Sequence, residues 1–87
     1  MADVYFMGNC AVDSKLGTSA VFRADAEVKQ AMIKSSKKII ALADQSKLGR
    51  TEAFKVADLE KIDVLITDLA SNDIQLEGFR NSGLQLV

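Results

Sequence analysis

The sequence contains no histidine, no proline and no tryptophan, and it has one cysteine among 87 residues. Without histidine the chain lacks the usual general base at neutral pH, the catalytic triads that depend on it and the commonest zinc ligand. The single Cys10 cannot form an internal disulfide, so a secreted, disulfide-stapled scaffold is not indicated. The composition therefore favours a protein of the reducing cytoplasm, and we predict neither a metal site nor a cofactor.

Long apolar runs and an excess of positive charge are also missing. The segment 39–43 is among the longest apolar runs, far short of the roughly 20 residues that span a bilayer. An acidic residue, Asp3, comes almost at once, unlike the basic start of a signal peptide. Eleven basic residues against twelve acidic ones offer no broad cationic surface to a phosphate backbone. We expect no membrane contact, and no DNA binding through this chain itself.

Short apolar segments are what the sequence does have. Hydrophobic residues make up 48% of the chain, which suits one small folded domain. Four segments are too short for helices and rich in aliphatic residues, so we predict strands at 4–7, 39–43, 64–67 and 84–87. The first should be buried on both faces, as in a covered parallel sheet. Long connections between the strands predict an α/β fold with an open, mainly parallel sheet and crossover helices.

The connections carry two predicted helices and one long loop. Asp25 can cap a helix that runs to about Lys37, with a buried face at Val28, Ala31, Met32 and Ser35. Residues 9–24 should be mostly loop, with a short strand near 19–22. Residues 52–57 should be irregular and 58–61 a helical turn. A second helix, capped by Ser71 or Asn72 and ended by Gly83, should turn Ile74 and Phe79 inward.

The predicted sheet has exposed edges at both ends of the chain. The sequence begins directly on one strand and stops directly on another, and uncovered sheet edges are a liability for a folded protein. We therefore expect residues 1–87 to be one partial domain.

Polar residues follow the predicted strands at the edge where open α/β sheets bind ligands. The segment 44–50 places the carboxylate of Asp44, the hydroxyl of Ser46 and the ammonium of Lys47 just past a buried strand. Lysine offers charge-assisted bonds to phosphate, and a carboxylate can accept from sugar hydroxyls. The sequence thus predicts an anion pocket here, with a solvated turn as the alternative.

Four further positions are candidates with plain structural alternatives. Glu27 suits a helix N-terminus electrostatically, whereas Lys29 gains nothing from the helix dipole. Thr18 lies in a Gly-Thr-Ser segment that can bind an anion or simply form a turn. Cys10 follows the first strand, but without a histidine to activate it we expect an ordinary thiol.

The order of these segments resembles the C-terminal effector domain of DeoR-family bacterial transcriptional repressors. The resemblance covers nearly the whole chain. It is carried by five stretches, Asp3–Gly8, Gly17-Thr18, Glu27–Ile33, Ile40–Gly49 with its Asp-x-Ser-Lys-x-Gly turn, and Ile62–Asp68 with Ile-Thr-Asp.

The resemblance implies a fold similar to ribose-5-phosphate isomerase and a sensor that binds a phosphorylated sugar, which releases the full-length repressor from operator DNA. The family's winged helix-turn-helix and an upstream phosphate loop are absent, so DNA would be bound by a domain outside this chain. A homo-oligomer is also expected. The alternatives are a sugar-phosphate isomerase-like enzyme and a segment of the regulator that serves only in oligomerisation. Carried over by position, the ligand contacts would be Asn9, Thr18, Glu27, Lys29, Asp44, Ser46 and Lys47.

Overall fold

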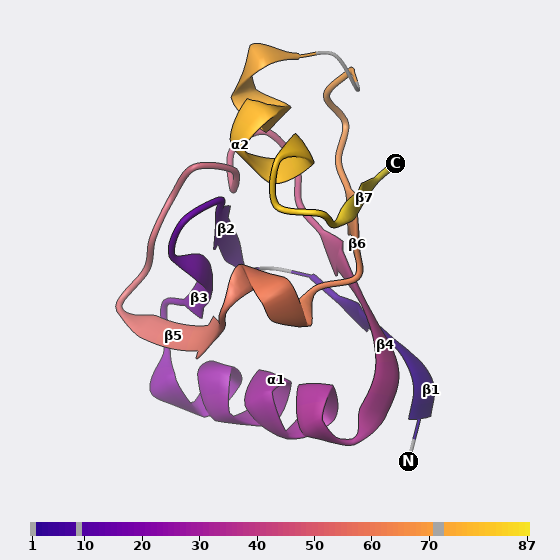
Figure 1. Cartoon of the computed structure of the whole chain (residues 1–87). Coiled ribbons are helices and arrows are strands. Elements are labelled where there is room, and N and C mark those ends of the chain that lie inside the picture. Colours follow the sequence, from indigo (N-terminus) through magenta and orange to yellow (C-terminus); the bar gives the residue numbers. More distant parts are fainter. Residues whose placement is uncertain (1, 9, 71–72) are drawn as a thin grey trace.

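The predicted parallel sheet is present. The computed structural model describes residues 2–8, 10–70 and 73–87 (Figure 1). Four strands form one sheet in the order β1-β4-β6-β7, and all neighbouring pairs are parallel. These strands are β1 (Ala2–Met7), β4 (Ser36–Leu42), β6 (Val64–Ile66) and β7 (Gln85–Leu86). The prediction of an α/β fold with a mainly parallel sheet is confirmed.

A second, antiparallel sheet lies where we expected loop and irregular chain. Its strands, in the order β2-β3-β5, are β2 (Ala11–Asp13), β3 (Gly17–Ala20) and β5 (Phe54–Ala57). The strands have three or four residues, and all four residues of β3 are buried although its sequence is Gly-Thr-Ser-Ala. The short strand predicted near 19–22 overlaps β3 only at its last two residues. The pattern of apolar side chains does not predict the burial of β3, because small residues pack closely there.

The first helix, α1 (Arg23–Lys34), buries a different face from the predicted one. Val28 is 62% exposed and Met32 is 37% exposed, so the prediction of an inward Val28 stripe is wrong. The inward positions have the same spacing shifted along the helix: Ala26, Lys29, Gln30 and Ile33 are buried or partly buried. Because this inward face includes a lysine and a glutamine, the pattern of hydrophobic residues does not predict it. The helix begins after Phe22 rather than at an Asp25 cap.

The remaining helices are single turns. The predicted turn near 58–61 is present as η1 (Leu59–Lys61), and η2 (Ile74–Leu76) leads directly into α2 (Glu77–Arg80). Phe79 is buried as predicted, but Ile74 is 79% exposed, so its inward placement is wrong. The predicted caps at 71 and 72 lie outside the described residues. No helix in the described ranges is long and apolar enough to cross a membrane.

One face of the parallel sheet is packed, and the opposite face is open at β1. Met7, Ala41 and Leu65 point into the core from β1, β4 and β6, and each is fully buried. On the opposite face Val4 is 41% exposed and Phe6 is 60% exposed. The expectation that β1 is buried on both faces is therefore wrong, because nothing among the described residues covers this side of the edge strand.

Candidate functional site at the carboxyl edge of the sheet

A tight turn follows β4 at the carboxyl edge of the parallel sheet. The Asp44 carboxylate accepts hydrogen bonds from the Ser46 backbone N–H at 3.0 Å and from the Ser46 hydroxyl at 2.5 Å. The Lys47 N–H donates to the Asp44 carbonyl at 3.0 Å. Aspartate commonly forms such hydrogen bonds with the residues two and three positions later in the chain. Residues 44–47 therefore form a preorganised turn.

Neighbouring elements hold this turn on two sides. The Gln45 N–H donates to the Asp68 carboxylate, which follows β6, at 3.1 Å. On the other side the Val12 N–H donates to the Lys47 carbonyl at 2.9 Å, and the Gly49 N–H donates to the Val12 carbonyl at 2.8 Å. The turn therefore connects the two sheets, and the backbone that carries the half-buried Lys47 is fixed in place.

The charge of Asp44 is stabilised in this turn. Hydrogen bonds from Ser46, followed by the nearby Lys47 charge, hold the pKa of Asp44 below its ordinary value. Hydrogen bonds to the charged form of a carboxyl group favour that form. Asp44 is thus a carboxylate at neutral pH, able to accept hydrogen bonds from hydroxyl groups.

A buried lysine lies on the inward face of α1. Lys29 is only 7% exposed, and its Nζ lies 2.7 Å from Oδ1 of Asp25 one turn earlier. A lysine is seldom buried without a partner, and Asp25 supplies one. The ion pair thus allows the Lys29 ammonium to be buried.

Cys10, after the end of β1, experiences the charges of both lysines. The thiol is 2% exposed, and burial raises its pKa, while the charges of Lys29 and Lys47 both act to lower it. Burial likewise raises the pKa of Tyr5, and Lys29 is the nearby charge that most opposes this shift. The charges of α1 and of the turn at 44–47 therefore both act on the thiol that follows β1.

The other three predicted site residues are placed differently. Thr18 is fully buried, and its hydroxyl donates to the Ala57 carbonyl at 3.3 Å, a contact within the antiparallel sheet. Glu27 lies on the exposed side of α1, away from the inward Lys29. Asn9 lies outside the described residues. Their roles as ligand contacts stay predictions, as do those of Lys29, Asp44, Ser46 and Lys47, of which the last three share the turn after β4.

Two residues near Lys29, namely Asp25 and Tyr5, were not among the predicted site residues. Asp25 was expected as a helix cap, and Tyr5 only as part of a strand. The spacing of Asp25 and Lys29, four residues apart on a helix, is a signal that could have identified the ion pair. Tyr5 carried no such signal, because only the packing of β1 against α1 brings it near Lys29.

The fold defines a small α/β domain with a hydrogen-bonded turn at the carboxyl ends of its parallel strands. Residues 1–69 match the family model described as the DeoR C terminal sensor domain. The chain belongs to this family.

Curated relatives agree with that assignment. The chain is 39% identical over 74 residues to the HTH-type transcriptional repressor GlcR of Bacillus subtilis, covering 85% of the chain and 29% of the relative. It is 33% identical over 85 residues to the HTH-type transcriptional regulator GlpR of Haloferax volcanii, covering 98% and 33%. A putative aga operon transcriptional repressor of Escherichia coli O157:H7 is 31% identical over 85 residues, covering 98% and 32%. The chain thus spans about a third of the length of these relatives.

Proposed function

We propose that this chain is the effector-sensing part of a DeoR-family transcriptional repressor and that it binds a phosphorylated sugar at the carboxyl edge of the parallel sheet. The observation that carries the proposal is the preorganised turn after β4, which places Lys47 beside Asp44 and Ser46 at the carboxyl edge of the sheet. An ammonium group beyond the ends of parallel strands suits a phosphate, which accepts charge-assisted hydrogen bonds from lysine.

The turn at 44–47 is suited to the sugar rather than to the phosphate. Asp44 is an acceptor for sugar hydroxyls, and Ser46 holds it in a single orientation. A preorganised acceptor of this kind loses little entropy when a ligand binds. We assign the phosphate to Lys47 and Lys29 and the hydroxyl groups to Asp44 and Ser46.

Sensing is favoured over catalysis by the state of the carboxylates. Isomerisation of a sugar requires a positioned base of suitable pKa. Asp44 accepts two hydrogen bonds and has a lowered pKa, Asp25 is paired with Lys29, and Asp68 accepts from Gln45. These three carboxylates have structural partners, which supports a non-enzymatic sensor over an isomerase-like enzyme.

The proposal for the whole protein extends beyond this chain. The relatives are named as HTH-type repressors and regulators. We propose a cytoplasmic repressor whose DNA-binding domain lies outside residues 1–87 and whose sensor has the ribose-5-phosphate isomerase-like fold. A ligand can move such a repressor off its operator only through different affinities for the two states.

The test is a titration of the full-length repressor bound to operator duplex. A panel of hexose and pentose phosphates is added, each beside its unphosphorylated sugar, and release of the duplex is followed by fluorescence anisotropy. We expect release with one phosphorylated sugar and none with its unphosphorylated partner. An equal response to both classes, or to neither, would overturn the proposal.

A further inference from the structure

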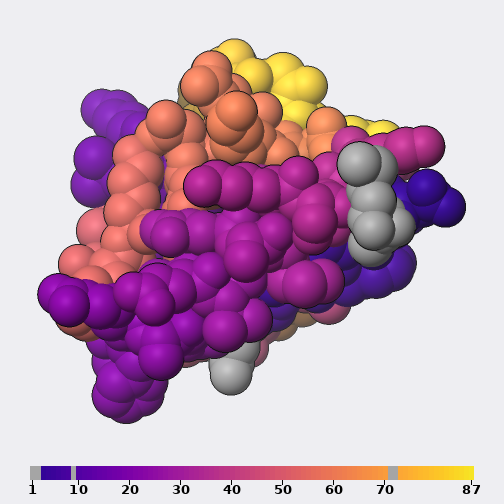
Figure 2. Space-filling model, turned by 90° about the horizontal axis from the view of Figure 1, so that it is seen from below, coloured from indigo at the N-terminus to yellow at the C-terminus, as the bar shows by residue number. Residues whose placement is uncertain are grey.

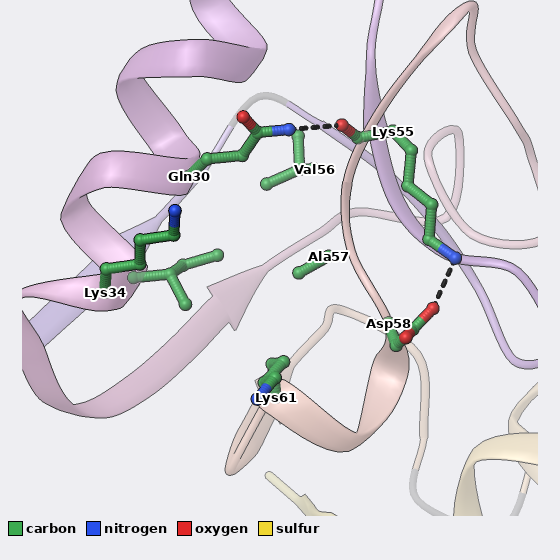
Figure 3. Close-up of a pocket in the computed structure, with 8 residues that line it drawn as sticks. Gln30, Lys34, Lys55, Val56, Ala57, Asp58 and Lys61 are labelled. Atoms are coloured by element: carbon green, nitrogen blue, oxygen red, sulfur yellow. Dashed lines mark hydrogen bonds and ion pairs between the residues drawn. The ribbon is translucent and has the colours of Figure 1, made fainter.

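A cavity lies away from the carboxyl edge. It has a volume of about 640 Å³ and opens between α1, β5 and η1 (Figure 3). None of the residues proposed above for the sugar phosphate lines it. Lys61 lies just before the start of β6, so the cavity is beside the amino end of that strand rather than beyond its carboxyl end. Figure 2 shows α1 in purple to magenta, with the salmon and orange residues of β5 and η1 along its side.

The ionic side chains of this cavity leave an excess of positive charge. Asp58 is the only acidic residue of the lining, and its carboxylate forms an ion pair with the Lys55 ammonium. That hydrogen bond and the charges of Lys55 and Lys61 lower the pKa of Asp58, so the carboxylate is charged and already engaged. Lys34 and Lys61 have no ion pair or hydrogen bond from their ammonium groups within the described part of the chain.

The two unpaired lysines come from different elements. Lys34 is in the last turn of α1, where the helix dipole favours a cation. That dipole does not account for Lys61, which η1 brings to the same hollow. Like charges that share a cavity repel one another, and an anion between them removes the repulsion.

The rest of the lining is apolar and firmly held. Ile33, Val56 and Ala57 contribute hydrocarbon surface, and Val56 is part of the buried core. The Gln30 side-chain amide donates to the Lys55 carbonyl at 2.9 Å and ties α1 to β5 along one rim (Figure 3). The cavity thus joins an apolar wall to two exposed lysines that form no ion pair within the described part of the chain, and its volume is in the range of small-molecule sites.

We propose that this cavity binds a small amphipathic anion, an organic phosphate monoester or carboxylate. Its anionic group lies between Lys34 and Lys61, and its apolar body lies against Ile33, Val56 and Ala57. The site is separate from the sugar-phosphate edge and gives the sensor a place for a second ligand. A sugar phosphate lacks the apolar body that this wall accommodates, so the two sites differ in ligand class.

The test uses phenyl phosphate as the probe in an NMR titration of the 87-residue chain, with benzoate, inorganic phosphate and benzyl alcohol as comparison compounds. We expect saturable shifts at the backbone amides of Gln30, Lys34, Val56 and Lys61 with phenyl phosphate or benzoate. The response to inorganic phosphate or to benzyl alcohol should be weaker by about fivefold or more, because each lacks one of the two contacts. Whichever of the two aromatic anions binds more tightly identifies the anionic group.

Two charge-matched double variants complete the test. Lys34→Gln with Lys61→Gln should weaken binding about fivefold or more, whereas Lys15→Gln with Lys38→Gln, exposed lysines outside the cavity, should leave it within about twofold. The amide spectrum of each variant checks that the fold is retained. Equal losses in the two double variants, shifts that map to the carboxyl edge, or no saturable shift with either aromatic anion would overturn the proposal.

Discussion

The ammonium of Lys29 lies 2.7 Å from the carboxylate of Asp25, one turn earlier on α1. The two side chains differ in exposure, 8% for the lysine and 42% for the aspartate. The positive charge is therefore the buried member of the pair, and the aspartate gives it a partner near the surface. Because of this asymmetry, removing Asp25 and removing Lys29 should lower the stability of the chain by different amounts.

Asp25→Ala should destabilise the chain more than Lys29→Met. Removing Asp25 leaves a buried ammonium without its partner, which costs about 1–3 kcal/mol. Methionine replaces the lysine with an apolar chain of similar length, and such a replacement of a buried ion pair is often close to neutral. Urea denaturation measures both free energies of unfolding. Equal losses for the two variants would contradict the inference that the lysine is the buried charge.

Lys47→Ala in the full-length repressor should weaken the response to the sugar phosphate at least tenfold, because one charge-assisted hydrogen bond contributes roughly 1.5–3 kcal/mol. Operator binding without effector should not change, since this residue lies in the proposed sensor site. Operator release by the phosphorylated sugar is the measurement.

Lys15→Ala, an exposed lysine in the β2–β3 turn, is the matched control for Lys47→Ala. Thermal melts of both variants should stay close to that of the parent, because an exposed or half-buried loop lysine contributes little packing. If Lys47→Ala responds within about twofold of the parent, Lys47 is a solvated turn residue and the phosphate must bind elsewhere.

Gly17→Ala should be strongly destabilising. Gly17 has φ of 82°, and an added Cβ would lie 2.2 Å from the Ala57 carbonyl oxygen on the neighbouring strand. The left-handed backbone and the steric overlap together should cost more than about 3 kcal/mol. Chemical denaturation or loss of the folded spectrum reports this cost.

Gly49→Ala separates the cost of the left-handed backbone from the cost of steric overlap. Gly49 has φ of 74° but nothing within 4 Å of an added Cβ. Only the left-handed conformation is penalised there, by about 1–2 kcal/mol. A Gly17→Ala loss no larger than that of Gly49→Ala would mean that β3 and β5 move apart without cost.

The turn at 44–47 should contribute to stability in a pH-dependent manner. The pKa of Asp44 is lower in the folded chain than its ordinary value of 3.8, so its contribution is complete above that value and is lost as the pH falls through the lower folded one. Asp44→Asn should therefore flatten the fall in the free energy of unfolding below about pH 4. Urea titrations across this range measure the slope.

Ser46→Ala provides a second measurement on the same turn. The Ser46 hydroxyl donates the 2.5 Å hydrogen bond that favours the charged form of Asp44. Removing it should flatten the acid limb in the same direction as Asp44→Asn but by a smaller amount, because the backbone hydrogen bond remains. An unchanged slope in both variants would show that the turn is not the source of the acid sensitivity.

The chain should self-associate through the open side of β1. Within the described residues β1 pairs only with β4, which leaves one strand edge free beside the exposed Val4 and Phe6. Free edges and apolar patches favour pairing with another chain. Sedimentation at several concentrations should detect oligomers, and Phe6→Lys should shift the equilibrium towards monomer.

Val28→Lys is the control for this surface, because Val28 is 62% exposed on α1 and comparable in exposure to Phe6. It should leave self-association unchanged. A parent chain that is strictly monomeric from micromolar to millimolar concentration, or equal effects of the two variants, would contradict association through β1.

The sequence by itself determined the parallel sheet and the turn after its second strand. Segments such as Val64–Ile66 are short, aliphatic and bounded by polar residues, and this local pattern is sufficient to predict a buried strand. The Asp-x-Ser-Lys arrangement likewise specifies a turn through contacts between residues two or three apart. These features depend on near neighbours, which a single sequence displays directly.

Only the tertiary structure decided which side of each element faces inward and which distant residues meet. Strand β3 is buried through pairing with β2 and β5, not through apolar side chains, and α1 turns Lys29 inward because Asp25 compensates its charge. The charges of Lys29 and Lys47 likewise act on Cys10 only with three separate segments in place. Such contacts join residues far apart in the chain, so their free energy leaves no periodic signal in the sequence.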